Sequence, residues 1–136
     1  MAVKPWLGAI KEPTWYKPRR GASEAPDAAL ELEWVHGYAG HRCSNNVRYT
    51  ASGEVVYHAA AVGVVYNKER HTQRFHVEHT DDVLCLAVHP NGRLVVTGEA
   101  GRRPKIIVWD CHSMRSLAVL QGFHKRGVVH VAFDPR

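Results

Sequence analysis

The sequence lacks the long apolar segments that define membrane-spanning proteins. No apolar run approaches the roughly 18 residues that cross a bilayer, and the longest candidate, Ala59 to Tyr66, has less than half that length. Met1 leads into Lys4-Pro5-Trp6 rather than into a basic cap and an apolar stretch, so no secretory signal is visible. We therefore expect neither a membrane protein nor a secreted one.

Cysteine is also scarce. The three cysteines (Cys43, Cys85 and Cys111) are odd in number and widely spaced. This usage favours a reducing compartment and excludes a disulfide framework. The hydrophobic fraction of 45% is nevertheless large enough for a packed core in a chain of 136 residues.

Acidic residues are fewer than basic ones. There are 18 lysines and arginines against 13 aspartates and glutamates, which gives a net charge of +5 and a pI near 9.3. Such a balance favours acidic partners: nucleic acid, anionic lipid or an acidic protein surface. Ten histidines add positive charge below about pH 6.5.

Residues 1–29 differ from the rest of the chain. They hold four of the seven prolines and two of the four tryptophans, with no sustained periodicity. Proline suits an extended backbone and interrupts helices and sheets. We interpret this region as an extended basic arm whose aromatic side chains dock on a partner; a disordered leader is the alternative.

Residues 30–78 show β-type patterns and no capped amphipathic helix. Leu30 to Trp34 alternates apolar and acidic residues, which predicts a half-buried strand. Further strands are expected within residues 54–60, 61–67 and 73–77, after Val47-Arg48-Tyr49 leads into a turn; Gly63 permits a bulge or tight bend. We therefore predict an all-β chain.

An internal repeat is the most informative feature of the second half. His79 to Pro90 aligns with His124 to Pro135 at an offset of 45 residues. From the start of the first copy to the start of the second, strands are expected at residues 83–88, 94–97, 106–110 and 116–120. A period of about 40 to 45 residues with four short strands is typical of a β-propeller blade. We assign a blade to residues 79–123 and the start of the next blade to residues 124–136.

The blade resembles a WD repeat, with His79 before its first strand and Trp109-Asp110 closing its third. The runs Leu30–Asn46 and Glu54–Asn67 resemble the HELP motif of the echinoderm microtubule-associated protein-like family. Lys4–Ile10 resembles the linker before later units in long, multi-unit members. The resemblance implies a tandem pair of propellers, so that this chain would be a propeller fragment: a HELP segment plus about one blade.

The resemblance also implies microtubule association, in the cytoskeleton or in a ciliary axoneme. One departure concerns the turn before the third strand, where many WD blades carry an aspartate bonded to the blade's histidine. Here the turn reads Glu99-Ala-Gly-Arg-Arg-Pro104. We therefore expect only a partial network of His79, Thr97 and Trp109, with Asp110 as a further structural residue of the blade.

No motif in the sequence predicts a metal, cofactor or catalytic site. His36-x4-His41 and His71-x4-His76 have a ligand-like spacing, but no Cys-x2-Cys accompanies them. Cys85 lies in an apolar strand and is expected to be core rather than a nucleophile. Gly98-x2-Gly101 lacks the strand–glycine–helix context of a phosphate loop. We expect a protein that is not an enzyme.

Basic clusters remain as binding candidates. They fall on the arm, on the loop before the third strand of the blade and on the next loop: Lys17, Arg19, Arg20, Arg102, Arg103, Lys105, Lys125 and Arg126. One hypothesis is contact with the acidic surface of tubulin in microtubules, alongside other cytoskeletal or axonemal proteins; ordinary solvated loop charge is the alternative. A WD scaffold that recruits proteins without touching tubulin is the rival function. Nucleic-acid binding is not expected, because interleaved aromatic residues are missing.

Overall fold

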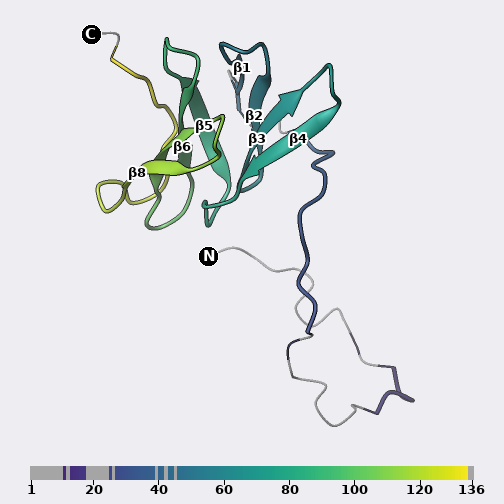
Figure 1. The fold of residues 1–136 in the computed structure, drawn as a ribbon. Helices are drawn as coiled ribbons and strands as arrows, with labels where there is room; N and C mark the ends of the chain where they lie inside the picture. The colour runs from purple at the N-terminus through teal and green to yellow at the C-terminus, as the bar shows by residue number, and fades with distance from the viewer. Residues whose placement is uncertain are drawn as a thin grey trace. The chain divides into compact units, whose positions relative to one another are not determined.

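The computed structural model describes residues 11, 13–17, 25, 27–38, 40, 41, 43, 44 and 46–134. The chain divides into two units, Met1–Glu31 and Leu32–Arg136. The described residues of the first unit are exposed, and one turn is closed there by the Tyr16 N–H donating to the Pro13 carbonyl at 2.9 Å. The second unit contains eight strands in two antiparallel sheets, and the described residues include no helix (Figure 1). The all-β prediction is confirmed.

The first sheet, here the first blade, is formed by the HELP-like region. Its strands run in the order β1 (Val47–Tyr49), β2 (Val55–Ala59), β3 (Val62–Asn67) and β4 (Thr72–His76). Val47–Tyr49, expected to lead into a turn, is a strand that pairs with β2. The region is therefore a complete four-stranded blade.

The second sheet, here the second blade, has the four strands that the repeat predicts. They are β5 (Val83–Val88), β6 (Leu94–Glu99), β7 (Ile106–Asp110) and β8 (Ser116–Leu120), again in sequence order. β6 extends two residues beyond the expected end because Gly98 and Glu99 still pair with neighbouring strands. Gly92, at φ 67°, supplies the left-handed backbone of the turn between β5 and β6.

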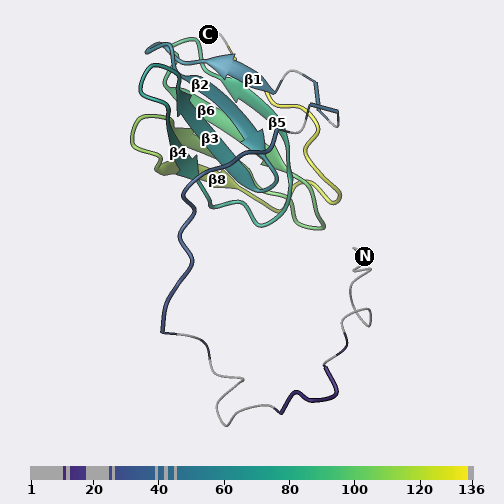
Figure 2. The ribbon, with the colours of Figure 1, turned by 90° about the vertical axis from the view of Figure 1, so that its right-hand side faces the viewer.

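The core lies between the two blades, which face each other in both views of the ribbon (Figures 1 and 2). Alternating positions of the strands supply it: Val56, Val65, Leu86, Val95, Ile107, Trp109 and Cys111. Gly63, where a bulge or bend was expected, instead pairs in register with His58 and His76. A Cβ at this glycine would lie 3.0 Å from the Trp109 ring, so the glycine permits close packing of the indole.

The strand predicted for Leu30 to Trp34 is wrong. Leu30 is fully exposed, and residues 32–38 cross the outer face of the first blade as an extended segment, here the strap. The Gln73 side chain holds it, because its amide accepts from the Val35 N–H at 2.8 Å and donates to the Val35 carbonyl at 3.1 Å. Trp34 lies against His71, with ring centroids 4.8 Å apart. Of the alternating apolar residues only Trp34 is partly buried, whereas Leu30 and Leu32 are exposed, so the alternation does not mark a strand ladder.

The predicted first strand of a following blade is not formed as a strand within residues 124–134. This segment joins the second blade through an isolated bridge between Ala100 and Gly127 and through the Val128 N–H, which donates to the Glu99 carbonyl at 3.0 Å. The described part of the chain has no helix with the length and hydropathy needed to cross a bilayer.

Candidate binding face at the loop end of the second blade

A hydrogen-bonded chain runs through the interior of the second blade. The Trp109 indole N–H donates to Thr97 Oγ1 at 3.1 Å, and Thr97 Oγ1 lies 2.7 Å from His79 Nε2. His79 Nδ1 lies 2.7 Å from the Glu99 carboxylate, and all four residues are buried. Burial lowers the pKa of His79 more than the Glu99 carboxylate raises it. The imidazole is therefore neutral: it donates to Glu99 from Nδ1 and accepts from Thr97 at Nε2.

The expectation of a partial network is wrong, because Glu99 supplies the missing carboxylate. It accepts hydrogen bonds from His79, the Thr80 N–H (3.0 Å), the Thr80 hydroxyl (3.2 Å) and the Lys105 N–H (3.1 Å). Burial alone raises the pKa of Glu99, but these hydrogen bonds outweigh it and hold the pKa below its usual value. The sequence did contain a signal: Thr97 and Glu99 are two residues apart in one strand and share a face.

The same interior joins the two blades. The His76 ring of β4 stacks on Trp109 with centroids 4.7 Å apart and an interplanar angle of 9°. Its Nε2 lies 2.9 Å from the Ser116 hydroxyl, which donates to Glu78 at 2.7 Å. His71, its expected partner in a ligand-like pair, is exposed and bonds the Tyr66 hydroxyl instead. His71 and His76 therefore have different hydrogen-bond partners and do not act as a pair.

Asp110 has a capping role at the β7–β8 turn. One carboxylate oxygen accepts two hydrogen bonds from the Arg93 guanidinium, at 2.6 and 2.9 Å. The other accepts from the His112 N–H at 2.7 Å. The guanidinium and these backbone donors lower the pKa of Asp110 to about 2 despite burial, so the carboxylate stays charged throughout the neutral range.

Cys85 is unsuited to nucleophilic chemistry. Its thiol is buried and donates to the Val128 carbonyl at 3.0 Å. Burial raises the pKa of Cys85 to about 11, so the reactive thiolate is rare at neutral pH. The residue packs the second blade against the segment that follows it.

Three of the predicted basic residues lie around one hollow at the loop end of the second blade. The hollow has a volume of about 410 Å³ and is lined by Arg102, Arg103, Gln121, Gly122, His124 and Lys125. Lys105 does not line it; its ammonium lies 3.4 Å from the Glu78 carbonyl. Arg126 is exposed beside it, Lys17 is exposed in the separate N-terminal unit, and Arg19 and Arg20 lie outside the described residues.

Backbone contacts hold the two loops that carry these cations. The Gly101 N–H donates to the Arg126 carbonyl at 3.0 Å, next to the Ala100–Gly127 bridge. The Gln121 side-chain amide donates to the Arg103 backbone carbonyl at 3.0 Å. Glu99 fixes both ends of the first loop, since it begins the loop and accepts from the Lys105 N–H at its end. The arrangement suits recognition of anions and holds no nucleophile–base pair.

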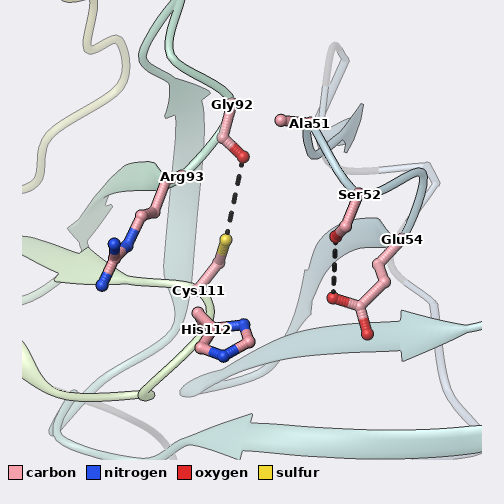
Figure 3. A pocket seen from close by; sticks show the side chains of 7 residues that line it. All are labelled: Ala51, Ser52, Glu54, Gly92, Arg93, Cys111 and His112. Carbon is pink, nitrogen blue, oxygen red and sulfur yellow. Dashed lines mark hydrogen bonds between the residues drawn. The ribbon is translucent and has the colours of Figure 1, made fainter.

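A second hollow, of about 250 Å³, lies between the blades at the Gly92 turn (Figure 3). Its charges are already paired. Glu54 binds Arg74 at 2.6 Å, and Arg93 binds Asp110 at 2.6 Å. It therefore offers little net charge to a partner, in contrast with the hollow at the loop end.

Known protein families match the regions that form the two blades. The HELP motif family matches residues 25–64, and the family described as WD domain, G-beta repeat matches residues 69–110. The chain is 41% identical over 121 residues to echinoderm microtubule-associated protein-like 1 of Mus musculus, and 42% identical over 121 residues to protein 2 of Rattus norvegicus. The chain belongs to the echinoderm microtubule-associated protein-like family. Each match covers 82% of this chain but only 15% and 19% of the relatives.

A solved structure supports the fold of this family member. A chain in the crystal structure of the mitotic checkpoint complex matches 92% of this chain, with a TM-score of 0.54 and 13% sequence identity. At that identity the match concerns the fold alone. Together with the WD repeat and the two four-stranded sheets, it identifies the architecture as adjoining blades of a β-propeller.

Proposed function

We propose that this chain is a non-enzymatic, microtubule-associated unit that contacts tubulin through the basic loops of its second blade. The observation that carries the proposal is the gathering of Arg102, Arg103 and Lys125 around one hollow, where none of them forms an ion pair with a described residue. The relatives are named as microtubule-associated proteins, which supplies the class of partner. Loops on a rigid β scaffold are frequent binding sites.

The remaining predicted cations have a supporting role in this proposal. Lys105 and Arg126 border the hollow's loops, and Lys17, Arg19 and Arg20 would add positive charge from the arm. Exposed charges act over about 8 Å at physiological ionic strength, so binding should weaken as salt is added. Placement in the cytoskeleton follows from the proposal, and placement in a ciliary axoneme with other axonemal proteins stays a prediction from the resemblance.

Co-sedimentation with polymerised tubulin tests the proposal. The chain should pellet with microtubules at low salt, and the triple variant Arg102→Glu, Arg103→Glu, Lys125→Glu should reduce pelleting by roughly tenfold or more. Reversal of Lys68, Arg70 and Arg115, which are exposed on other turns, is the matched control for net charge.

Two results would contradict the proposal in different ways. Equal loss of pelleting in the control triple would show that binding depends on net charge and not on these loops. Absence of pelleting by folded wild-type chain would favour the rival function, a WD scaffold that recruits other proteins, and the search would turn to those partners.

A further inference from the structure

The residues that line the hollow at the loop end give it a positive charge. Arg102, Arg103 and Lys125 are basic, and no carboxylate is among the lining residues. The carboxylate of Asp81, in the segment before β5, lies against Gly101, 2.8 Å from where a Cβ would be. Asp81 does not line the hollow. The lining of the hollow therefore presents positive charge and no carboxylate to solvent.

Two cations elsewhere on the described blades, Arg74 and Arg93, have carboxylate partners that the lining cations do not. Arg74 bonds Glu54 and the His112 carbonyl, and Arg93 bonds Asp110 through two nitrogens. Within the described residues, Arg102, Arg103 and Lys125 make no side-chain ion pair. Their charge can therefore go to a ligand without the loss of an internal ion pair.

An apolar residue projects beside the charges. Phe123 stands between the lining residues Gly122 and His124 and is 80% exposed. Arginine and aromatic side chains are enriched at protein interfaces, where the ring supplies apolar area and the guanidinium binds carboxylates. The combination suits a ligand with both carboxylates and an apolar side chain.

The loops are held in place before any ligand arrives. The Ala100–Gly127 bridge, the Gly101–Arg126 hydrogen bond and the Gln121–Arg103 hydrogen bond fix their backbones relative to one another. A site whose backbone is already ordered loses less conformational entropy on binding. The hollow thus differs from a set of cations on an unconstrained loop.

We propose that this hollow binds a short, glutamate-rich peptide segment, whose carboxylates pair with Arg102, Arg103 and Lys125 and whose apolar side chain packs on Phe123. The inference rests on the proposed function for the source of that segment, an acidic portion of tubulin. A peptide fits better than RNA, because the lining offers no run of aromatic rings on which successive bases would stack.

Fluorescence anisotropy with a labelled glutamate-rich peptide containing one tyrosine tests this site directly. The folded chain should bind it, and the triple variant Arg102→Gln, Arg103→Gln, Lys125→Gln should weaken binding by about tenfold or more. The matched variant Lys68→Gln, Arg70→Gln, Arg115→Gln should change it by less than about twofold. Phe123→Ser should weaken the tyrosine peptide but leave an all-glutamate peptide nearly unchanged. Near-ultraviolet circular dichroism confirms that each variant is folded.

The outcomes separate this inference from the proposed function. If the wild-type chain pellets with microtubules but does not bind the peptide, the peptide site is overturned and microtubule association stands. If the glutamine triple loses the peptide yet pellets normally, the site is supported and the tubulin contact lies elsewhere. A labelled RNA that binds more tightly than the peptide, and is lost in the same triple, would overturn the peptide in favour of nucleic acid.

Discussion

In the second blade, Trp109, Thr97, His79 and Glu99 form one hydrogen-bonded chain, whereas the first blade buries His58 with neither ring nitrogen bonded to a described residue. Both blades nevertheless have four strands in the same order. The first is held by the strap on its outer face and by apolar packing on its inner face. The hydrogen-bonded network therefore belongs to the second blade alone, and a four-stranded blade forms without it.

The blades also differ in what they present to solvent. The charges at the hollow beside the Gly92 turn are paired within each blade, Glu54 with Arg74 in the first and Arg93 with Asp110 in the second. The loop end of the second blade leaves three cations unpaired around one hollow. The proposed binding function therefore belongs to the blade whose interior is most extensively bonded.

Trp109→Ala is expected to have the largest effect on stability, because the indole contacts both blades. It stacks on His76 of the first blade and donates to Thr97 of the second. A buried tryptophan truncated to alanine loses about 3–5 kcal/mol of the free energy of unfolding. Urea unfolding followed by circular dichroism should show both blades lost in one transition. Separate transitions would contradict this coupling; Phe123→Ala, at an exposed position, is the control.

Glu99→Gln should have the next largest effect and should act on the second blade. The amide cannot accept all the hydrogen bonds that the carboxylate accepts from His79, Thr80 and Lys105, so we expect a loss of about 2 kcal/mol. Hydrogen exchange of the Lys105 amide should accelerate more than that of β2 amides. Uniform acceleration through both blades would show that the network is not local to the second.

Acid should weaken the contact between the blades. Burial lowers the pKa of His76 to about 4, below the ordinary value near 6.5, and lowers the pKa of His58 as well. The unfolded chain then binds more protons than the folded chain between these values, so stability is full above about pH 6.5 and falls as pH drops toward 4. For His76 alone, about 2 kcal/mol is lost between pH 7 and pH 5. Urea unfolding across this range measures it, and a flat profile would contradict the neutral, buried state.

Gln73→Ala should have the smallest effect and should act on the first blade. It removes both hydrogen bonds to Val35, which together with the Trp34 contacts hold the strap. We expect a loss of about 1–2 kcal/mol, with greater exposure of Trp34 to a fluorescence quencher. Arg70→Ala, on the neighbouring turn, is the control. An unchanged quenching constant would show that the aromatic contacts hold the strap without the amide.

The sequence predicted the second blade well because its signals are local or repeated. The 45-residue offset, the Asn91-Gly92 turn and alternating apolar residues placed β5 to β8 within two residues. The strap was mistaken for a strand because Leu30, Leu32 and Trp34 alternate with glutamates as in a half-buried strand. In the structure Leu30 and Leu32 are exposed, and side-chain contacts hold Trp34. Glu99 was missed because its role depends on strand β6 continuing past Thr97.

The binding face was only partly predictable. The sequence spacing did not indicate that Arg102 and Lys125 lie around one hollow. The β7–β8 hairpin separates them along the chain, and the Ala100–Gly127 bridge brings their two loops together. It also did not show that Lys105 turns toward Glu78 instead. Which cations share a hollow depends on side-chain direction and loop pairing, and these arise only after the sheet has formed.

Glu99 bonds at both ends of the 99–105 loop, while the side chains of Arg102 and Arg103 make no contribution to the interior. Anchoring and recognition are thus divided between different positions of one short loop. Because both side chains are exposed, substitutions at Arg102 or Arg103 should change the free energy of unfolding by no more than about 0.5 kcal/mol. A protein built this way can acquire a new binding preference by changing two codons, with its scaffold left intact.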